Sequence, residues 1–185
     1  FEGAKYVYTP PPRAIENQDV LWHAVRSDIL SAISTDHCAF LWDGQKTMGR
    51  DDFSKIPNGG PGLENRLHMI HEFGVRAGRI SLNRMVELLA TNPAKLFGLY
   101  PRKGTIAIGS DADLAIWDPV LKRTISQSML HHGADYTPYE GLEVTGWPTT
   151  IVLGGRCIVE NGIINESKPS GEYLVRNRSS MTAPA

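Results

Sequence analysis

The chain has 185 residues, and its 19 Lys and Arg against 20 Asp and Glu give a formal net charge of −1. This balance, without a block of basic residues, gives no indication of nucleic-acid binding, and no apolar run approaches the roughly 20 residues that span a bilayer. Two cysteines, Cys38 and Cys157, are too few for a disulfide framework. We therefore expect an ordinary globular protein with reduced thiols in a cytoplasmic setting.

The first forty residues predict the order strand, loop, helix, strand. A strand is expected over residues 4–9, and three prolines end it because proline cannot donate to a ladder. A helix is expected over residues 16–27, where apolar residues recur at helical spacing. The apolar run that starts at Ile29 predicts a second, buried strand over residues 29–40. This order indicates a parallel βαβ unit with helices covering the sheet.

The second predicted strand leads into Asp36, His37 and Cys38. Because α/β barrels carry their chemistry where parallel strands end, Asp36 is the first candidate for a catalytic residue. A carboxylate supplies a hard oxygen ligand for a metal or a base for a metal-bound water. The alternative is that Asp36 caps the next segment or closes a turn. His37 and Cys38 fit packing beside such a site better than chemistry.

Residues 41–62 predict a long loop that is rich in glycine and proline. Its most glycine-rich part, residues 57–62, would let main chain come close to a ligand, and an ordinary surface loop is the alternative. No Gly-Lys-Ser/Thr follows, so this is not a phosphate-binding P-loop.

Three further helices are predicted between residues 63 and 98. The first covers residues 63–73 and carries His68 and His71, which we expect to be surface or half-buried residues and not metal ligands. Ser81 is expected to cap the second helix, and the third begins near Pro93 and ends at Gly98.

The pattern after Gly104 predicts a small antiparallel β unit. Short apolar runs alternate with turn residues, and Asn161 and Gly162 suit the mirror-image turn of a tight hairpin. Asp111 and Asp113 fit the fixing of a turn before a strand better than metal binding. Cys157 is expected to be a small core residue, and the tail from Ser179 to be loose or held by a partner.

Taken together, short motifs from about residue 5 to residue 171 resemble the hydantoinase and dihydropyrimidinase family. The Gly-Ser-Asp-Ala-Asp motif alone marks only the wider amidohydrolase group, so the resemblance depends on the whole set. The motifs are Thr35-Asp36-His37-Cys38, Gln45-Lys46, Gly49-Arg50, Asp52-Phe53, Lys55-Ile56-Pro57-Asn58-Gly59, Gly78-Arg79-Ile80-Ser81, Pro93 to Thr105, Gly109 to Leu114, Trp117-Asp118-Pro119 and Tyr139-Glu140-Gly141.

The resemblance implies an α/β fold: the C-terminal part of a TIM-type (β/α)8 metallohydrolase barrel, followed by part of a small β-sandwich domain. The last barrel strands and helices would occupy residues 1–103, the β-sandwich part residues 104–170, and a tail residues 171–185. A whole barrel needs about 250 residues, so 185 residues cannot hold barrel and sandwich together. The start at Phe1, without Met, hints likewise at further sequence upstream.

The resemblance also implies two divalent metal ions, usually zinc, that share a hydroxide. The family's His-x-His pair, carboxylated Lys and two further His have no counterpart here, and only Asp36 maps onto a metal ligand. Asp36 would hold one metal, accept the hydroxide proton and pass it to the leaving nitrogen. The main chain of Thr9 and Asn58 would bind the substrate ring. Thr9 replaces the family's usual Ser, and Ala39 its usual Pro.

The implied reaction is hydrolysis of the cyclic amide bond of hydantoins or dihydropyrimidines to N-carbamoyl amino acids, by an enzyme active only with the upstream part of the chain. The expected partners are a small cyclic imide or ureide and three further subunits of a homotetramer, with residues 173–178 on a neighbour. One alternative is a non-catalytic structural relative of the collapsin-response-mediator type, although such proteins lack the Asp at position 36. The other is an inactive fragment with an exposed barrel edge.

Overall fold

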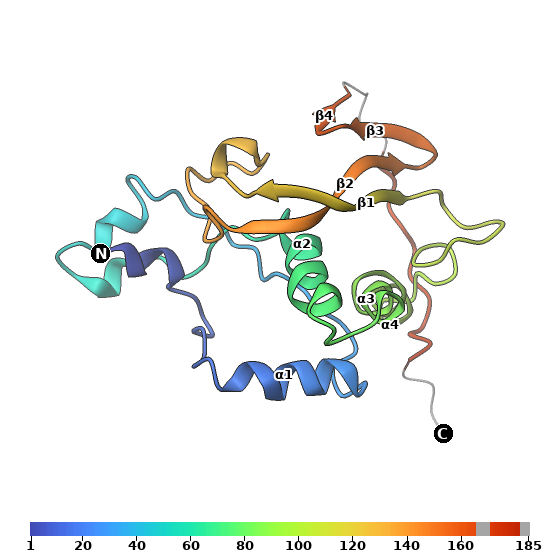
Figure 1. Cartoon of the computed structure of the whole chain (residues 1–185), viewed down its shortest axis with the longest axis horizontal. Helices are drawn as coiled ribbons and strands as arrows, with labels where there is room; N and C mark the ends of the chain where they lie inside the picture. Colours follow the sequence, from blue (N-terminus) through green and yellow to red (C-terminus); the bar gives the residue numbers. More distant parts are fainter. Residues whose placement is uncertain (166–170, 182–185) are drawn as a thin grey trace.

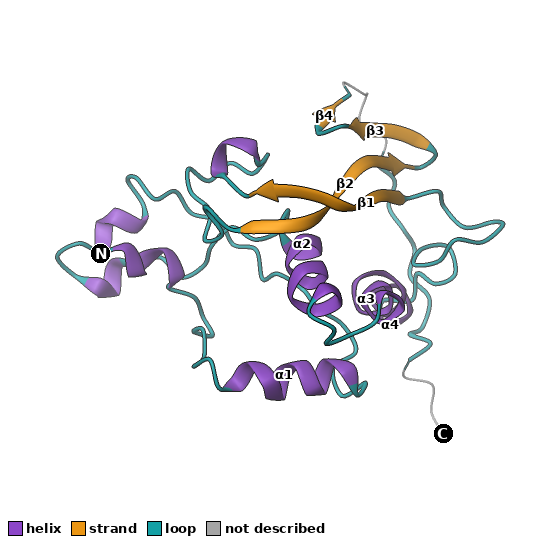
Figure 2. Ribbon diagram, in the orientation of Figure 1, coloured by secondary structure: helices purple, strands orange, loops and turns teal. Residues whose placement is uncertain are grey.

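A four-stranded antiparallel sheet lies over a group of short helices in this computed structural model, which describes residues 1–165 and 171–181 (Figure 1). Helices α2, α3 and α4 lie beneath the sheet, and α1 lies farther from it (Figure 2). The helices are α1 (Asn17–Arg26), α2 (Arg66–Ile70), α3 (Leu82–Val86) and α4 (Asn92–Leu96), and the strands are β1 (Leu114–Thr124), β2 (Glu143–Leu153), β3 (Arg156–Glu160) and β4 (Ile163–Ile164).

The predicted helices are confirmed, with changes at their ends. Helix α2 begins at Arg66, later than expected, and continues as wider π-type turns over His71–Arg76. The Ser81 Oγ accepts the Arg84 N–H at 3.1 Å, which is the predicted N-cap. A π-type segment, Glu87–Thr91, joins α3 to α4. Short 3₁₀ helices lie at Glu2–Tyr6, Lys46–Gly49, Phe53–Lys55 and Gln127–Met129.

The predicted antiparallel β unit is confirmed. The four strands pair in the order β1-β2-β3-β4, so each strand lies beside its neighbour in sequence. Asn161 and Gly162 connect β3 to β4 with φ of 52° and 81°, as the mirror-image hairpin turn requires. Apolar runs and turn residues therefore predicted the antiparallel unit, although β1 and β2 extend beyond the predicted runs at residues 114–117 and 151–153.

The two predicted strands of the N-terminal half are wrong as secondary structure. Residues 2–6 form a 3₁₀ helix, and residues 29–40 run without a β ladder. Single main-chain bonds hold the second segment in place, from Ile33 N to Leu88 O at 3.2 Å and from Cys38 N to Gly60 O at 3.3 Å. A strand exists only when neighbours complete its hydrogen bonds, and the described residues supply no parallel neighbour to either segment.

Two apolar clusters hold the elements together. The first joins α1 to the α3 region through Val25, Ile80, Met85 and Leu88. The second consists of Val144 of β2 with Ile125 and Leu130 from the segment after β1, and Met69 of α2 packs against it.

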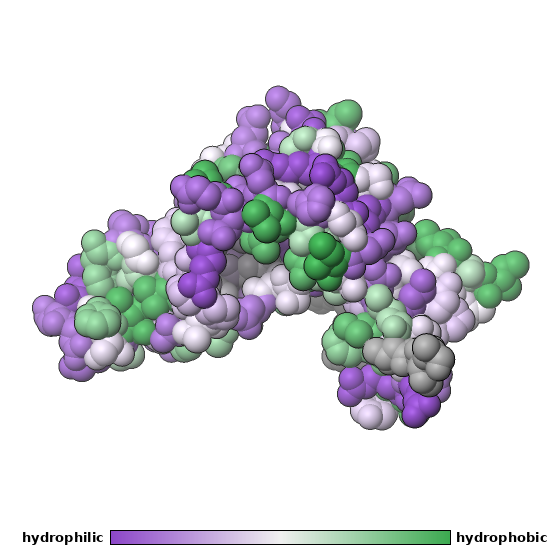
Figure 3. All heavy atoms as spheres, turned by 90° about the horizontal axis from the view of Figure 1, so that it is seen from below, coloured by the Kyte–Doolittle hydropathy of each residue, from purple (hydrophilic) through white to green (hydrophobic). Residues whose placement is uncertain are grey.

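Helix α1 carries both buried and exposed apolar residues. Val25 is buried in the first cluster, whereas Val20 and Leu21 are 69% and 52% exposed. Figure 3 shows the molecule from below, with hydrophobic residues exposed among the hydrophilic ones. Part of the apolar surface of α1, at Val20 and Leu21, is therefore left uncovered by the described residues.

His68 and His71 join α2 and its π-type extension to the sheet, and both are buried, so the expectation of surface or half-buried residues is wrong. The His68 ring lies 3.9 Å from the Trp147 ring, centroid to centroid, and the His71 Nδ1 lies 2.8 Å from the Thr145 carbonyl oxygen. Burial lowers the pKa of His68 to about 4, so the imidazole is neutral at neutral pH. These histidines pack the helix against the sheet.

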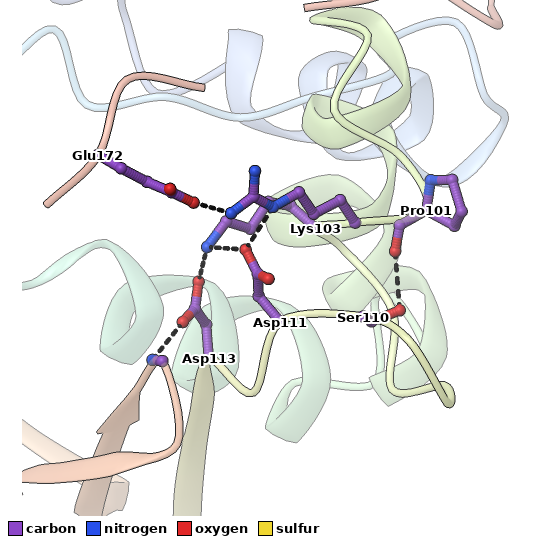
Figure 4. A network of polar contacts seen from close by, with 8 residues as sticks. Pro101, Lys103, Ser110, Asp111, Asp113 and Glu172 are labelled. Carbon is purple, nitrogen blue, oxygen red and sulfur yellow. Dashed lines mark hydrogen bonds and ion pairs between the residues drawn. The ribbon is translucent and has the colours of Figure 1, made fainter. Parts of the chain in front are cut away.

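An ion-pair network fixes the loop before β1, as predicted for Asp111 and Asp113 (Figure 4). The Lys103 ammonium pairs with both carboxylates, at 2.9 Å from Asp111 Oδ2. Arg102 pairs with Asp111 at 2.9 Å and with Glu172 of the tail. Asp113 Oδ1 accepts the Gly154 N–H at 2.8 Å, which connects this loop to the end of β2.

Replacement of Lys103 by Met should destabilise the protein that contains this chain, lowering its Tm by about 2–5 °C. Hydrogen bonds from Lys103 lower the pKa of Asp111 and Asp113, so their stabilising contribution is present above the unfolded pKa near 3.9 and is lost as the pH falls through the folded values. The pKa of Lys103 is raised in return, so its contribution persists until the pH rises above about 10.4. Thermal melts between pH 3 and pH 8 measure the difference.

The matched control for this prediction is Lys122→Met, because Lys122 pairs with Glu143 at 3.6 Å and both side chains are about two-thirds exposed. It should leave the Tm almost unchanged. Equal melting curves for wild type and Lys103→Met at pH 7 would contradict the stabilising role.

The tail returns to its own chain over the described residues 171–181. Asn177 N donates to Gly98 O at 2.9 Å, and Ser180 N donates to Lys95 O at 3.2 Å. Tyr173 and Val175 remain 85% and 78% exposed. The predicted contact of residues 173–178 with a neighbouring subunit stays a prediction, and the end of the predicted tail, residues 182–185, lies outside the described part.

Both cysteines are free, as expected, but Cys157 is exposed on β3, so its prediction as a core residue is wrong. Among the described helices, none combines the length and apolar character needed to cross a bilayer.

Candidate active site

Three segments far apart in sequence meet where the site was predicted: residues 7–9, 36–38 and 57–62. The Gly59 N–H donates to the Val7 carbonyl at 2.9 Å, and the Cys38 N–H donates to the Gly60 carbonyl at 3.3 Å. The glycine-rich loop therefore lies between the other two segments. The segments that carry Thr9, Asp36 and Asn58 are thus brought together.

Two glycines make this close approach possible. Gly59 has φ of 140°, and a Cβ on it would collide with the Cys38 carbonyl oxygen. A Cβ on Gly60 would lie only 2.6 Å from the Tyr8 hydroxyl oxygen. Burial raises the pKa of Tyr8, so its phenol stays neutral. In this structure the glycines therefore serve contacts within the chain, and the predicted close approach to a ligand stays a prediction.

Asp36 lies in an irregular segment of the chain, with an exposed side chain and φ of 46°. This left-handed conformation is one that Asp tolerates better than most residues. The next helical turn begins at Lys46 and has Gln45 at its N-cap, so Asp36 caps no helix there. Capping, one of the two alternatives to catalysis, is thereby removed, and the described main-chain hydrogen bonds close no turn at Asp36.

His37 forms hydrogen bonds to the C-terminal end of the glycine-rich loop. Its Nδ1 accepts the N–H of Gly62 at 3.1 Å and that of Leu63 at 3.2 Å. The ring thus positions the loop beside Asp36, in line with a packing role.

Thr9 and Asn58 are both exposed, and their main chains are close to the Val7–Gly59 hydrogen bond. Asn58 immediately precedes the donor Gly59, and Thr9 follows the acceptor Val7 by two residues. The structure therefore brings the two predicted substrate-binding segments together.

Sequence reasoning missed Lys46, which is completely buried beside the same segments. Its Nζ donates to the Val7 carbonyl at 3.2 Å and to the Pro57 carbonyl at 2.7 Å. Burial lowers the pKa of Lys46. The signals in the sequence were the Gln45-Lys46 motif of the resemblance, to which no role was assigned, and a lysine within a glycine-rich loop, which suits a solvated side chain equally well.

The described residues do not supply a complete set of metal ligands. Over residues 1–165 and 171–181, no group of three or more His, Cys, Asp or Glu could hold a metal ion. Asp36 offers one exposed carboxylate, a hard oxygen donor of the kind that divalent ions accept. The chain therefore fits a metal site as the donor of one ligand to a larger set.

Comparison with known proteins identifies the family to which the chain is similar. Residues 12–158 match the Amidohydrolase family. The chain is 49% identical over 178 residues to a D-hydantoinase of Rhizobium radiobacter and 51% identical over 178 residues to one of Ralstonia pickettii, covering 96% of this chain and 39% of each relative.

Solved structures agree with these relatives. The structure of a D-hydantoinase from Bacillus sp. AR9 superposes with a TM-score of 0.94 at 49% identity, covering 97% of this chain and 39% of that one. A dihydropyrimidinase from Brevibacillus agri NCHU1002 gives a TM-score of 0.86 at 50% identity, covering 88% and 35%. The chain therefore has the α/β fold of part of a hydantoinase, and it spans about 39% of the length of the curated relatives.

Proposed function

The chain belongs to the amidohydrolase family, and we propose that it forms the C-terminal part of an enzyme that opens the ring of hydantoins or dihydropyrimidines. The product would be an N-carbamoyl amino acid. The observation that carries the proposal is the identity of about 50% to D-hydantoinases over nearly the whole chain. The meeting of residues 7–9, 36–38 and 57–62 supports it, because these segments carry the three predicted site residues.

Membership of this family implies a divalent metal cofactor. We propose two ions, with zinc as the usual metal, and Asp36 as a ligand of one of them. The remaining ligands, including a carboxylated Lys, would come from outside this sequence. Bound divalent ions lower the pKa of water and polarise the carbonyl that is attacked.

The proposed roles of this chain follow from the positions of its own residues. The Asp36 carboxylate would take a proton from the attacking water, whose oxygen bonds to the ring carbonyl carbon. It would then give that proton to the ring nitrogen as the C–N bond breaks. The main chain of Thr9 and Asn58 would hold the ring in place, so these two residues contribute orientation and no chemistry.

The domain organisation is proposed on the same basis. Residues 1–103 would be the last strands and helices of a (β/α)8 barrel, residues 104–170 part of a β-sandwich and residues 171–185 a tail; of these, residues 166–170 and 182–185 lie outside the described part. The absence of a ladder at residues 29–40 fits a barrel strand whose neighbours belong to the rest of the barrel. A homotetramer and a cytoplasmic location remain predictions, the second based on the two free cysteines.

The two alternatives receive less support. A non-catalytic relative of the collapsin-response-mediator type is disfavoured because Asp36 is present and the relatives are named as D-hydantoinases. The second alternative, an inactive fragment, is compatible with the chain's covering only part of its relatives' length. It concerns only the isolated 185 residues.

The test uses the full-length protein that contains this chain. We expect it to bind divalent metal and to open hydantoin or dihydrouracil, with activity lost on chelation and restored by added metal. Metal content by elemental analysis and ring opening by ultraviolet absorbance measure both properties. Full-length protein that binds no metal and opens neither ring would favour the structural relative.

A further inference from the structure

Lys46 is the one completely buried ammonium group described beside the candidate site. Its side chain comes from the short helix Lys46–Gly49 and is 0% exposed. Both of its described hydrogen bonds go to main-chain carbonyls, those of Val7 and Pro57. The Phe40 ring centroid lies 5.9 Å from the same Nζ.

These two bonds join the segments on which the substrate-binding residues lie. Pro57 directly precedes Asn58, and Gly59 directly follows it. Lys46 holds the Pro57 carbonyl at 2.7 Å, while the Gly59 N–H donates to Val7 at 2.9 Å. The main chain is therefore fixed to the Val7 segment on both sides of Asn58.

Burying an ammonium group to join two loops costs free energy. Taking the charge out of water carries a large desolvation cost, and neutral carbonyls compensate it less well than a carboxylate would. A charged donor forms shorter and stronger hydrogen bonds than a neutral one, and it has three N–H groups to share between acceptors. These properties suit a group that must hold two carbonyls at a fixed separation.

We propose that Lys46 is a positioning residue for ring binding, which sets the separation between the Thr9 and Asn58 main chains by bridging Val7 and Pro57. Lys46 itself touches neither substrate nor metal in this assignment. The inference rests on the proposed function, because Thr9 and Asn58 bind a ring only if the protein is a cyclic amidase.

A positioning role and a merely structural role predict different kinetics. If Lys46 sets the geometry of the ring-binding main chain, its loss weakens ground-state and transition-state binding together, and KM rises while kcat changes little. If Lys46 only holds the fold, its loss lowers the fraction of folded enzyme, which reduces the apparent kcat and leaves KM unchanged.

The experiment compares Lys46→Met with wild type in the full-length, metal-loaded protein. Methionine keeps most of the length and the apolar part of the lysine side chain but removes the donors. We expect KM for hydantoin to rise about tenfold, equivalent to about 1.4 kcal/mol, with kcat within about threefold and metal content unchanged. Lys46→Arg, which keeps charged donors, should recover part of the loss.

The matched control is Lys55→Met in the same loop. Lys55 is 65% exposed and lies 3.7 Å from Asp52, so its loss should leave KM at the wild-type value. If Lys46→Met does not fold, Lys46→Gln, with a shorter neutral donor, takes its place with the same expected rise in KM.

Four outcomes would overturn the inference. A wild-type KM in the Lys46 variant refutes the bridge, and so does a loss confined to kcat. An equal rise of KM in Lys55→Met shows that the effect is not specific to the bridge. If the wild-type protein opens no ring, both the proposed function and this inference are wrong. This outcome differs from failure of the bridge alone, in which the wild-type protein is active.

Discussion

Replacement of Asp36 by Asn in the full-length, metal-loaded protein should reduce ring opening by about 10³-fold or more. The amide keeps the size of the side chain but cannot take a proton, and it is a weaker ligand than a carboxylate. Proton transfer by a positioned side chain alone contributes about 10²–10⁴-fold to a rate, so loss of the shuttle dominates the expected effect. Steady-state kinetics with hydantoin measure kcat, and elemental analysis measures the retained metal.

The control for this prediction is Asp51→Asn, which makes the same chemical change at another exposed carboxylate of the following loop. It should retain near wild-type turnover. An Asp36→Asn protein with near-normal kcat would remove Asp36 from the reaction, and the site would then have to lie elsewhere in the protein.

Replacement of Arg84 by Met should destabilise the protein by about 2–4 kcal/mol. The Arg84 guanidinium is nearly buried, and it donates from Nε to the Val25 carbonyl at 2.9 Å and from a terminal nitrogen to the Leu30 carbonyl at 3.0 Å. Methionine leaves both carbonyls without their donor, at a cost of about 1–3 kcal/mol each. The midpoint of urea unfolding, with an unchanged slope, measures the loss.

The ion pairs of Arg84 contribute less to the expected loss of stability than its hydrogen bonds to the two carbonyls. Asp28 at 2.5 Å and Glu87 at 3.1 Å are 80% and 50% exposed, so water solvates both carboxylates after the replacement. Arg76→Met is the control, because Arg76 is exposed and pairs with Glu72 one helical turn away. Its effect should stay below about 1 kcal/mol, and an equal loss in the two variants would show that Arg84 has no special anchoring role.

Features that depend on neighbouring residues in sequence were predictable. The Ser81 cap, the Asn161–Gly162 turn and the ion-pair loop around Asp111 each depend on contacts over about ten residues. Such signals are present in the local sequence, so they can be recognised without knowledge of the rest of the fold.

Features that depend on distant partners were not predictable from the residues alone. Residues 29–40 have the composition of a strand, but a strand needs ladder partners that the described chain does not provide. His68 and His71 gave no sign of burial, because the Trp residues that cover them lie on strands some 45–80 residues later. Lys46 shows the same limit, since its acceptors are main-chain carbonyls that leave no trace in residue type.

The crowding around Gly59 and Gly60 has a consequence for any attempt to alter substrate preference by mutagenesis. A side chain at either position would strike Cys38 or Tyr8 and push apart the segments that form the site. The neighbouring Asn58 has an exposed side chain and is proposed to act through its main chain, so position 58 is open to variation. A randomised library of this loop should accordingly vary position 58 and keep both glycines constant.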